Sequence, residues 1–198
     1  MALLKEPTMW DIIVIGVSAG GMNALGKILP CLPSGHRVPV IVVQHVHPDS
    51  DDLLARCLNK RCRSTVMQAS EKATILPRHI YVAPPGVHLL IASDRTFSLS
   101  RSDPVHFARP SIDRLFISAA TVYGSRIVGV ILTGASSDGA AGLKAIKAAG
   151  GIAVVQDPRT AEVDIMPRAA IAAGEIDFIL PLDAIGKFLA RLSNGGTL

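Results

Sequence analysis

Aromatic and charged residues are both scarce in this sequence of 198 residues. Aromatic residues make up 4% of it and charged residues 18%. Proteins that bind single-stranded nucleic acid stack bases on exposed aromatic rings beside a basic stripe, whereas the basic residues here are scattered and the net charge is only +4. We therefore expect no nucleic-acid partner.

Cysteine is also rare, and long apolar runs are missing. The three cysteines are an odd number and form no Cys-x-x-Cys pair, which argues against a disulfide framework and a cysteine zinc site. No apolar run approaches the ~20 residues that cross a bilayer, and the first ten residues, MALLKEPTMW, are too short and too interrupted for a signal peptide. These features predict a cytoplasmic protein.

Apolar segments alternate with amphipathic ones along the chain, which is typical of an α/β protein. Hydrophobic residues make up 49% of the sequence, and we expect a single domain over residues 1–198 with its core at about 11–192. Strands are predicted at 11–16, 38–44, 65–69, 127–133, 152–156 and 178–180, and those at 11–16, 38–44 and 127–133 have the apolar character of buried strands. Helices are predicted at 22–29, up to about 60, at 111–123, 140–149, from about 167, and at 182–192.

The segment from His79 to Ser100 interrupts this alternation. Three short strands, at 79–83, 87–91 and 96–100, are separated by turns that contain Pro84-Pro85-Gly86 and Ser93-Asp94. We predict an antiparallel insertion at a sheet edge. The fold class is thus a doubly wound three-layer sandwich of about six or seven mostly parallel strands with this insertion.

Ser18 lies in a turn of small residues between the first strand and the first helix. The pattern Gly16-x-Ser18-x-Gly20 has the spacing of a nucleophile elbow, in which bulky neighbours would clash with a tight turn. A serine there can attack a substrate bound at the carboxyl ends of the strands. The alternative is that Ser18 only caps the following helix.

Two other predicted strands are also followed by polar residues that suit hydrolysis. His45 follows the second strand, and Asp138 lies in the small-residue turn after the strand at 127–133. Parallel strands place their carboxyl ends on one rim, so Ser18, His45 and Asp138 are predicted to converge as nucleophile, base and orienting carboxylate. Singly, His45 could bond a carbonyl and Asp138 could cap its own helix.

At this point the chain resembles the CheB-type chemotaxis protein-glutamate methylesterases. The resemblance extends over nearly all of residues 11–192 and depends on six motifs together. These are Ile15-Gly16-Val17-Ser18-Ala19-Gly20-Gly21, Val43-Gln44-His45, Tyr81-Val82-Ala83-Pro84, Arg109-Pro110-Ser111-Ile112-Asp113, Val130-Ile131-Leu132-Thr133-Gly134 with Asp138-Gly139-Ala140, and Met166-Pro167-Arg168-Ala169-Ala170.

The resemblance implies a serine hydrolase with Ser18, His45 and Asp138 as its triad and no cofactor. The implied substrate is a γ-glutamyl methyl ester on the cytoplasmic helices of a methylated chemoreceptor, with methanol as product and glutamine deamidation as a related activity. Contact with membranes would then be peripheral, through the receptors. The oxyanion and substrate vicinity would include Ala19, Gly20, Ala135, Arg109 and Met166.

The chain departs from the family pattern in three places. Ala19 stands where many members have threonine, and Ala135 stands where many have methionine. The backbone donors survive these changes, but a hydroxyl that could assist an oxyanion does not. In addition, Asp164-Ile165 precedes Met166 where a glycine is common, which predicts a differently shaped loop.

Members of the family also carry an amino-terminal receiver domain that restricts substrate access. Only seventeen residues precede Ser18 here. We therefore expect a catalytic domain without a receiver domain, active without a phosphodonor, with a separate receiver protein as a second candidate partner.

Three other functions remain open from the sequence. His45-x-His47-x-Asp49 after a strand suits a metal hydrolase, although no distal ligand set stands out. Gly16-x-Ser18-x-x-Gly21 approaches a dinucleotide-binding motif, but the second strand ends in Gln44-His45 instead of an acid. A non-catalytic signalling or binding module of the same fold is the third.

Overall fold

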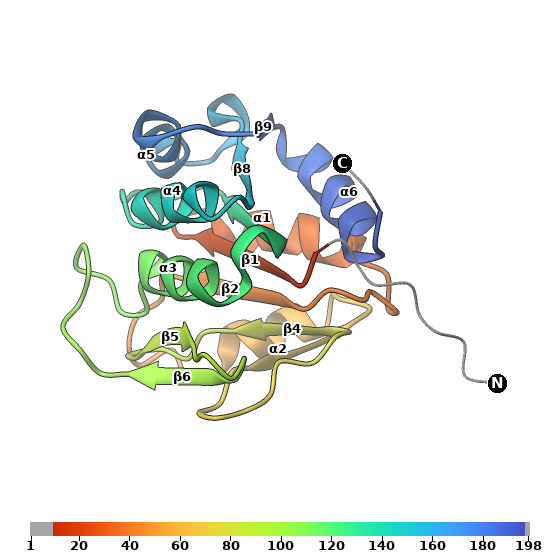
Figure 1. Ribbon diagram of the computed structural model, residues 1–198, viewed down its shortest axis with the longest axis vertical. Coiled ribbons are helices and arrows are strands. Elements are labelled where there is room, and N and C mark those ends of the chain that lie inside the picture. Colours follow the sequence, from red (N-terminus) through yellow and green to blue (C-terminus); the bar gives the residue numbers. More distant parts are fainter. Residues whose placement is uncertain (1–9, 197–198) are drawn as a thin grey trace.

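A seven-stranded sheet forms the centre of the molecule, as the computed structural model of residues 10–196 shows (Figure 1). Its strand order is β3-β4-β2-β1-β7-β8-β9, and every neighbouring pair is parallel. The predicted doubly wound sandwich is therefore confirmed. The strands are β1 (Ile12–Val17), β2 (Val40–Gln44), β3 (Thr65–Gln68), β4 (His79–Val82), β7 (Ile127–Ile131), β8 (Ile152–Gln156) and β9 (Phe178–Leu180).

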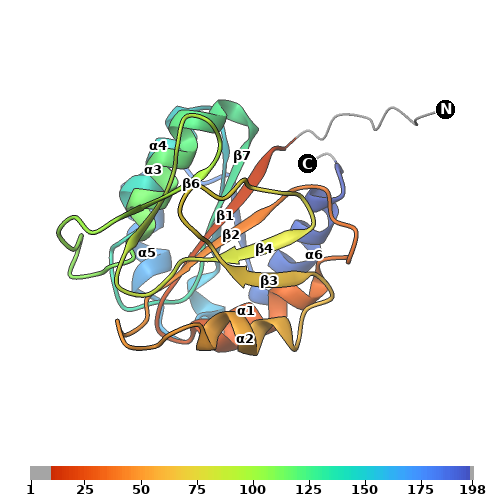
Figure 2. The same ribbon diagram turned by 90° about the horizontal axis from the view of Figure 1, so that it is seen from below.

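Helices cover both faces of this sheet (Figure 2). One face packs against α1 (Gly21–Ile28), α2 (Leu53–Asn59) and α6 (Leu182–Ser193). The other packs against α3 (Ile112–Tyr123), α4 (Ala140–Ala148) and α5 (Ile165–Ala173). The longest of these helices have 12 residues, and within residues 10–196 no helix has the length and apolar character needed to cross a membrane.

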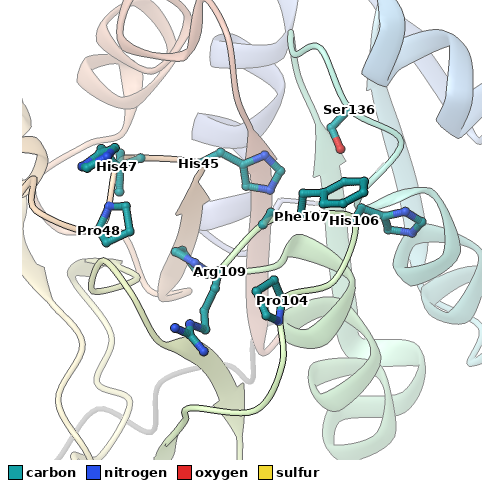
Figure 3. A pocket seen from close by; sticks show the side chains of 11 residues that line it. His45, His47, Pro48, Pro104, His106, Phe107, Arg109 and Ser136 are labelled. Carbon is teal, nitrogen blue, oxygen red and sulfur yellow. The ribbon is translucent and has the colours of Figure 1, made fainter.

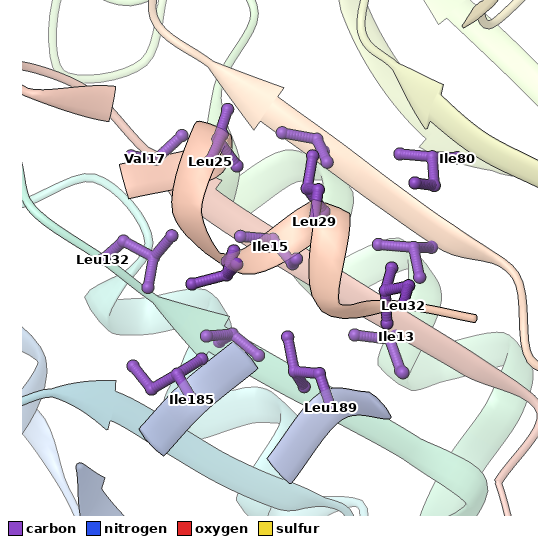
Figure 4. Packing of buried hydrophobic residues seen from close by; sticks show 14 of the residues in the cluster. Ile13, Ile15, Val17, Leu25, Leu29, Leu32, Ile80, Leu132, Ile185 and Leu189 are labelled. Carbon is purple, nitrogen blue, oxygen red and sulfur yellow. The ribbon is translucent and has the colours of Figure 1, made fainter. Parts of the chain in front are cut away.

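The central strand β1 is buried on both faces because its side chains alternate between two cores. Ile13, Ile15 and Val17 point into the cluster under α1 and α6, where Leu25, Leu29, Ile185 and Leu189 surround them (Figure 4). Ile12 and Val14 belong to the cluster under α3 and α4. This alternation is the ordinary period of a strand, so the run of β-branched residues specifies a doubly covered position.

The segment 79–100 differs in part from its prediction. Strand β4 is not part of the antiparallel insertion, because it lies inside the main sheet and pairs in parallel with both β2 and β3. Only β5 (His88–Ile91) and β6 (Phe97–Ser100) form the separate two-stranded antiparallel sheet. The turn-forming residues Pro84-Pro85-Gly86 mark the end of a core strand here, and local pattern cannot tell such an ending from a hairpin turn.

The strand order reverses direction between β1 and β7. The chain leaves β1 toward β2 on one side and leaves β7 toward β8 on the other. Beyond the strands the two segments stay side by side, since the Leu132 N–H donates to Gly16 O and the Ser18 N–H donates to Thr133 O, both at 3.0 Å. Such a reversal opens a crevice at the carboxyl ends of the strands, where ligands of open α/β sheets bind.

Candidate active site

Ser18 and His45 immediately follow two neighbouring parallel strands. Val17 pairs with Gln44 at the end of β1 and β2, and the His45 N–H continues the ladder by donating to Val17 O at 3.1 Å. Ser18 is half-buried in the turn that leads to α1. The two backbones are therefore adjacent, at the separation of paired strands.

His45 and Asp138 are in direct contact although 93 residues separate them. The distance from His45 Nε2 to Asp138 Oδ2 is 2.8 Å, and the side chains are 15% and 0% exposed, respectively. The Ser18 hydroxyl makes no hydrogen bond to His45 or to any other part of the chain that the structure describes. The structure thus brings His45 and Asp138 into contact and places Ser18 immediately after the adjoining strand β1.

Asp138 also binds the amino-terminal end of α3. Its Oδ1 accepts hydrogen bonds from Ser111 Oγ at 2.8 Å and the Asp113 N–H at 3.0 Å, and its Oδ2 accepts one from the Ile112 N–H at 2.7 Å. Asp138 does not cap its own helix, because α4 has Gly139 at its N-cap and no side-chain cap. A helix other than the one that follows therefore fixes the carboxylate.

These hydrogen bonds decide the ionisation of Asp138. Burial is the largest single influence and opposes the charged form, but the hydrogen bonds from His45, Asp113, Ile112 and Ser111 outweigh it and hold the pKa of Asp138 below its usual value. An ionised carboxylate only accepts hydrogen bonds, so His45 Nε2 carries the proton that it shares with Asp138. In the neutral imidazole, Nδ1 is then the basic nitrogen.

Asp113 binds the amino-terminal end of α4 in the same way. Its Oδ1 accepts hydrogen bonds from the Gly139 N–H at 2.9 Å and the Gly142 N–H at 2.6 Å. The amino-terminal N–H groups of each helix therefore bind a carboxylate from the start of the other, since Asp113 lies in the first turn of α3 and Asp138 lies two residues before α4. Burial raises the pKa of Asp113, and the negative charge of Asp138 raises it further by a smaller amount. The hydrogen bonds from Gly142 and Gly139 act against this rise.

We expect Asp113→Asn to stabilise the fold at neutral pH. The amide oxygen can still accept from Gly139 and Gly142, and the charge next to Asp138 is gone. Because the pKa of Asp113 is raised in the folded state, its contribution to stability is complete below the unfolded pKa of about 3.9 and is lost as the pH rises through the folded pKa. The advantage of Asp113→Asn should therefore be present at about pH 7 and shrink toward about pH 4.

Urea unfolding of both proteins at the two pH values measures this difference. Asp113→Ala is the control, since it removes the acceptor as well as the charge and should cost about 1–3 kcal/mol at either pH. A variant Asp113→Asn that is as destabilised as Asp113→Ala would contradict the prediction.

Gln44 joins the backbones of Ser18 and His45. Its Nε2 donates to Ser18 O at 2.8 Å and to His45 O at 3.0 Å, and the residue is 7% exposed. Both partners are carbonyl oxygens, so the orientation of the amide is fixed by chemistry. Its Oε1 has no partner among the described residues and lies against Gly21, where any β-carbon would collide with it. The turn after β1 therefore needs glycine at 21 to accommodate this amide.

The other predicted site residues lie around this centre. Ala19 and Gly20 begin the turn after Ser18, and in the described part of the chain neither backbone N–H has an acceptor. Met166 is buried, and its N–H donates to Gly134 O at 2.9 Å. A β-carbon at Gly134 would collide with both Met166 and Ser18, so these side chains pack against that glycine. Ala135 is exposed in the same loop.

A pocket of about 390 Å³ opens beside His45 (Figure 3). Residues 45–48, which come directly after β2, form one wall of the pocket. The loop of residues 101–110, which includes Arg109, forms the other. Arg109 Nη1 donates to Arg101 O and Ser102 O, both at 3.2 Å, so it also orders this loop. The full lining is His45, Val46, His47, Pro48, Pro104, His106, Phe107, Ala108, Arg109, Pro110 and Ser136.

The possible metal ligands His45, His47 and Asp49 do not face one another. His45 is bonded to Asp138, whereas His47 and Asp49 form a separate pair at 3.4 Å with side chains 77% and 89% exposed. Within residues 10–196, no group of three or more histidine, cysteine, aspartate or glutamate residues is gathered to hold an ion. The arrangement therefore favours the nucleophile, base and carboxylate chemistry.

Sequence reasoning missed three residues of this site. Gln44 and Asp113 appear in the quoted motifs without a role, and Phe107 does not appear. A glutamine at the end of an apolar strand and an aspartate in the first turn of a helix are detectable signals, but their partners lie on other segments. Phe107 lies with His106 at the tip of a two-residue hairpin turn in which both residues have positive φ values, and the sequence there lacks the usual Asn-Gly signal for such a turn.

Comparison with known proteins gives a consistent result. Residues 13–189 match the family model described as CheB methylesterase. A protein of Leptospira interrogans, provisionally named protein-glutamate methylesterase/protein-glutamine glutaminase, is 52% identical over 183 residues, which are 92% of this chain and 95% of that protein. A Burkholderia lata protein with this pair of activities in its name is 42% identical over 189 residues, 93% of this chain but 52% of its own length.

A solved structure agrees with this result. The crystal structure of the Thermotoga maritima CheB methylesterase catalytic domain superposes with a TM-score of 0.89 at 35% sequence identity. The match covers 92% of this chain and 98% of that one.

Proposed function

This chain belongs to the CheB methylesterase family, and we propose that it is a protein-glutamate methylesterase whose nucleophile, base and orienting carboxylate are Ser18, His45 and Asp138. The substrate is a γ-glutamyl methyl ester on the cytoplasmic part of a methylated chemoreceptor, and the product is methanol. The observation that carries the assignment of residues is the His45–Asp138 contact beside Ser18 at the reversal of strand order.

The reaction begins with proton transfer. His45 Nδ1 takes the proton of the Ser18 hydroxyl while Oγ attacks the ester carbonyl carbon. The unpartnered N–H groups of Ala19 and Gly20 supply donors for the oxyanion that develops. The tetrahedral intermediate collapses when His45 returns the proton to the leaving methoxide, which departs as methanol and leaves a glutamyl ester on Ser18.

Water completes the cycle. His45 removes a proton from the water that attacks the acyl-enzyme, and then protonates Ser18 Oγ as the free γ-carboxylate of glutamate leaves. Asp138 keeps the Nε2 proton in place and stabilises the imidazolium formed in each half-reaction. With glutamine as substrate, the same steps release ammonia, which matches the second activity in the names of the relatives.

Methanol release from membranes that carry methylated chemoreceptors tests this function. The purified chain should release methanol in proportion to enzyme concentration and leave glutamate at the methylated positions. We also propose a cytoplasmic location, because the substrate sites are cytoplasmic. A protein that binds such membranes without releasing methanol would support the non-catalytic module instead.

We expect Gln44→Leu to lower kcat by about 10–100-fold with a smaller change in KM, because small displacements of reacting groups are costly. The variant removes the amide donors that tie Ser18 O and His45 O together. Steady-state methanol release measures both constants.

Gln68→Leu is the matched control for this prediction. Gln68 ends β3 as Gln44 ends β2, and its Nε2 donates to Asp51 O at 2.9 Å, away from the triad. The role of Gln44 would be refuted if both variants had the same kcat, or if only KM changed.

A further inference from the structure

Phe107 is the most exposed large apolar side chain in the described part of the chain. It is 103% exposed, whereas Leu53, the next, is 56% exposed. Phe107 also lines the pocket whose opposite wall carries His45 (Figure 3). A fully solvated phenyl ring at the entrance to a candidate active site is therefore unpartnered in the chain itself.

A hydrogen-bonded hairpin turn holds this ring in solvent. Residues 105–108 form a two-residue hairpin in which the Val105 N–H donates to Ala108 O at 3.1 Å and the Ala108 N–H donates to Val105 O at 2.8 Å. The two residues at the tip, His106 and Phe107, have φ values of 48° and 61°. Turns with two positive φ values favour Asn-Gly, and bulky side chains are strained there. The chain thus keeps a phenylalanine where glycine would be less strained, a pattern common at functional sites.

The base of the loop is anchored in two places. Arg109 holds the carbonyls of Arg101 and Ser102, as described above. In addition, His88 Nδ1 accepts from the Ser111 N–H at 3.1 Å, so its Nε2 donates to Asp103 O, at 3.0 Å. The position of Phe107 relative to His45 is therefore set by the fold.

The pocket lining indicates the charge of the partner. Its ionisable residues are Arg109 and three histidines, and it contains no carboxylate. The three histidines lie within 3.7 Å of carboxylates outside the lining, those of Asp138, Asp49 and Asp113. Arg109 is therefore the lining charge that has no carboxylate partner among the described residues, and it attracts an acidic segment, to which the exposed ring adds an apolar contact. A helix with glutamates on one stripe and apolar residues three or four positions away presents both features.

We propose that Phe107 is a specificity-determining residue that docks on an apolar position of the acidic substrate helix, one turn from the glutamyl ester that enters the pocket. This inference depends on the proposed function. It adds how the enzyme distinguishes an ester on its substrate protein from a free ester. An ester that enters the pocket meets His45, which lies beside the end of β1 that Ser18 follows.

Steady-state kinetics of Phe107→Ala with two substrates tests this role. Receptor-bearing membranes are the first, and the γ-methyl ester of N-acetylglutamate α-amide, which has no helix, is the second. We expect KM for the membranes to rise at least about tenfold, the size typical of a lost aromatic anchor, and kcat/KM for the small ester to fall much less. Leu76→Ala is the control, because Leu76 is 48% exposed and is not in the pocket lining.

Phe107→Gly separates docking from damage to the turn. Glycine adopts positive φ freely, so this variant should unfold at a temperature no lower than Phe107→Ala, yet should lose receptor turnover to the same extent. Recovery of receptor turnover in Phe107→Gly would overturn the proposal, because the ring would then have no role.

The remaining outcomes are distinct. A wild-type protein that hydrolyses both substrates, with equal losses for both in Phe107→Ala, would overturn the docking role and leave the proposed function standing. A wild-type protein that releases methanol from neither substrate would overturn the proposed function, and this inference with it.

Discussion

Replacing Ser18 with alanine is expected to reduce methanol release by a factor of the order of 10⁶, as removal of a serine nucleophile does in other triads. No covalent intermediate can form without Oγ, and His45 has no hydroxyl to deprotonate. Because the Ser18 hydroxyl makes no hydrogen bond within the described residues, its loss should leave the fold and its unfolding temperature unchanged. Methanol release by matched amounts of folded protein measures the effect.

Ser137→Ala is the control for this experiment. Ser137 is exposed in the loop that carries Asp138, and within residues 10–196 only its backbone carbonyl accepts a hydrogen bond, from the Ala140 N–H at 3.2 Å. This variant should keep wild-type activity. Wild-type methanol release by a folded Ser18→Ala protein would instead show that another group attacks the ester.

Much of the fold follows from local sequence because the strands are doubly buried. Runs such as Ile12–Val17 and Val40–Gln44 need two apolar layers, and the helices between them supply these layers. The order of the strands in the sheet is harder to predict from local sequence. The chain passes from β3 to β4 before the hairpin of β5 and β6. The residues of β4 do not indicate that this strand inserts beside β2 in the main sheet. The pairing of distant strands is decided by the whole core.

The site residues also divide into those that local sequence predicts and those that depend on distant segments. Ser18 and His45 lie at strand ends, which apolar runs locate to within a residue. Asp138 lies seven residues beyond the end of β7, and the direction of its side chain depends on the amino-terminal end of α3. The exchange of caps between Asp138 and Asp113 joins residues 25 apart through two helices. Local rules assign a carboxylate to the nearest helix and miss such an exchange.

Asp138 is the second residue whose replacement should have a very large effect, and the substitution to test is Asp138→Asn. Asp138 accepts four hydrogen bonds, two at each oxygen. An amide has one oxygen, so its NH₂ must replace one of the two acceptors. If NH₂ faces His45, it also faces the Ile112 N–H, and if it faces Ser111, it also faces the Asp113 N–H. Either orientation leaves one buried N–H of α3 without an acceptor, at a cost of about 1–3 kcal/mol.

The effect on catalysis comes from the tautomer of His45. With the amide NH₂ directed at Nε2, the imidazole can accept that bond only by moving its proton to Nδ1, which is the nitrogen that must receive the proton of Ser18. We therefore expect kcat to fall by about 10²–10⁴-fold, as when the orienting aspartate of other triads becomes asparagine. The same substitution should lower the free energy of unfolding, and the two effects need separate measurements.

Nitrogen-15 NMR of histidine-labelled protein distinguishes these two effects, because it reports which ring nitrogen of His45 carries the proton. Wild-type protein should show Nε2–H, and Asp138→Asn should show Nδ1–H in the folded fraction that urea titration defines. Asp157→Asn is the control, since Asp157 immediately follows β8 and pairs with Arg159 at 2.6 Å instead of a triad residue. A loss of rate no larger than the unfolded fraction, with Nε2–H retained, would reduce Asp138 to a cap of α3. A large loss of rate with Nδ1–H in folded protein would establish that its charge holds His45 in the tautomer that accepts the proton of Ser18.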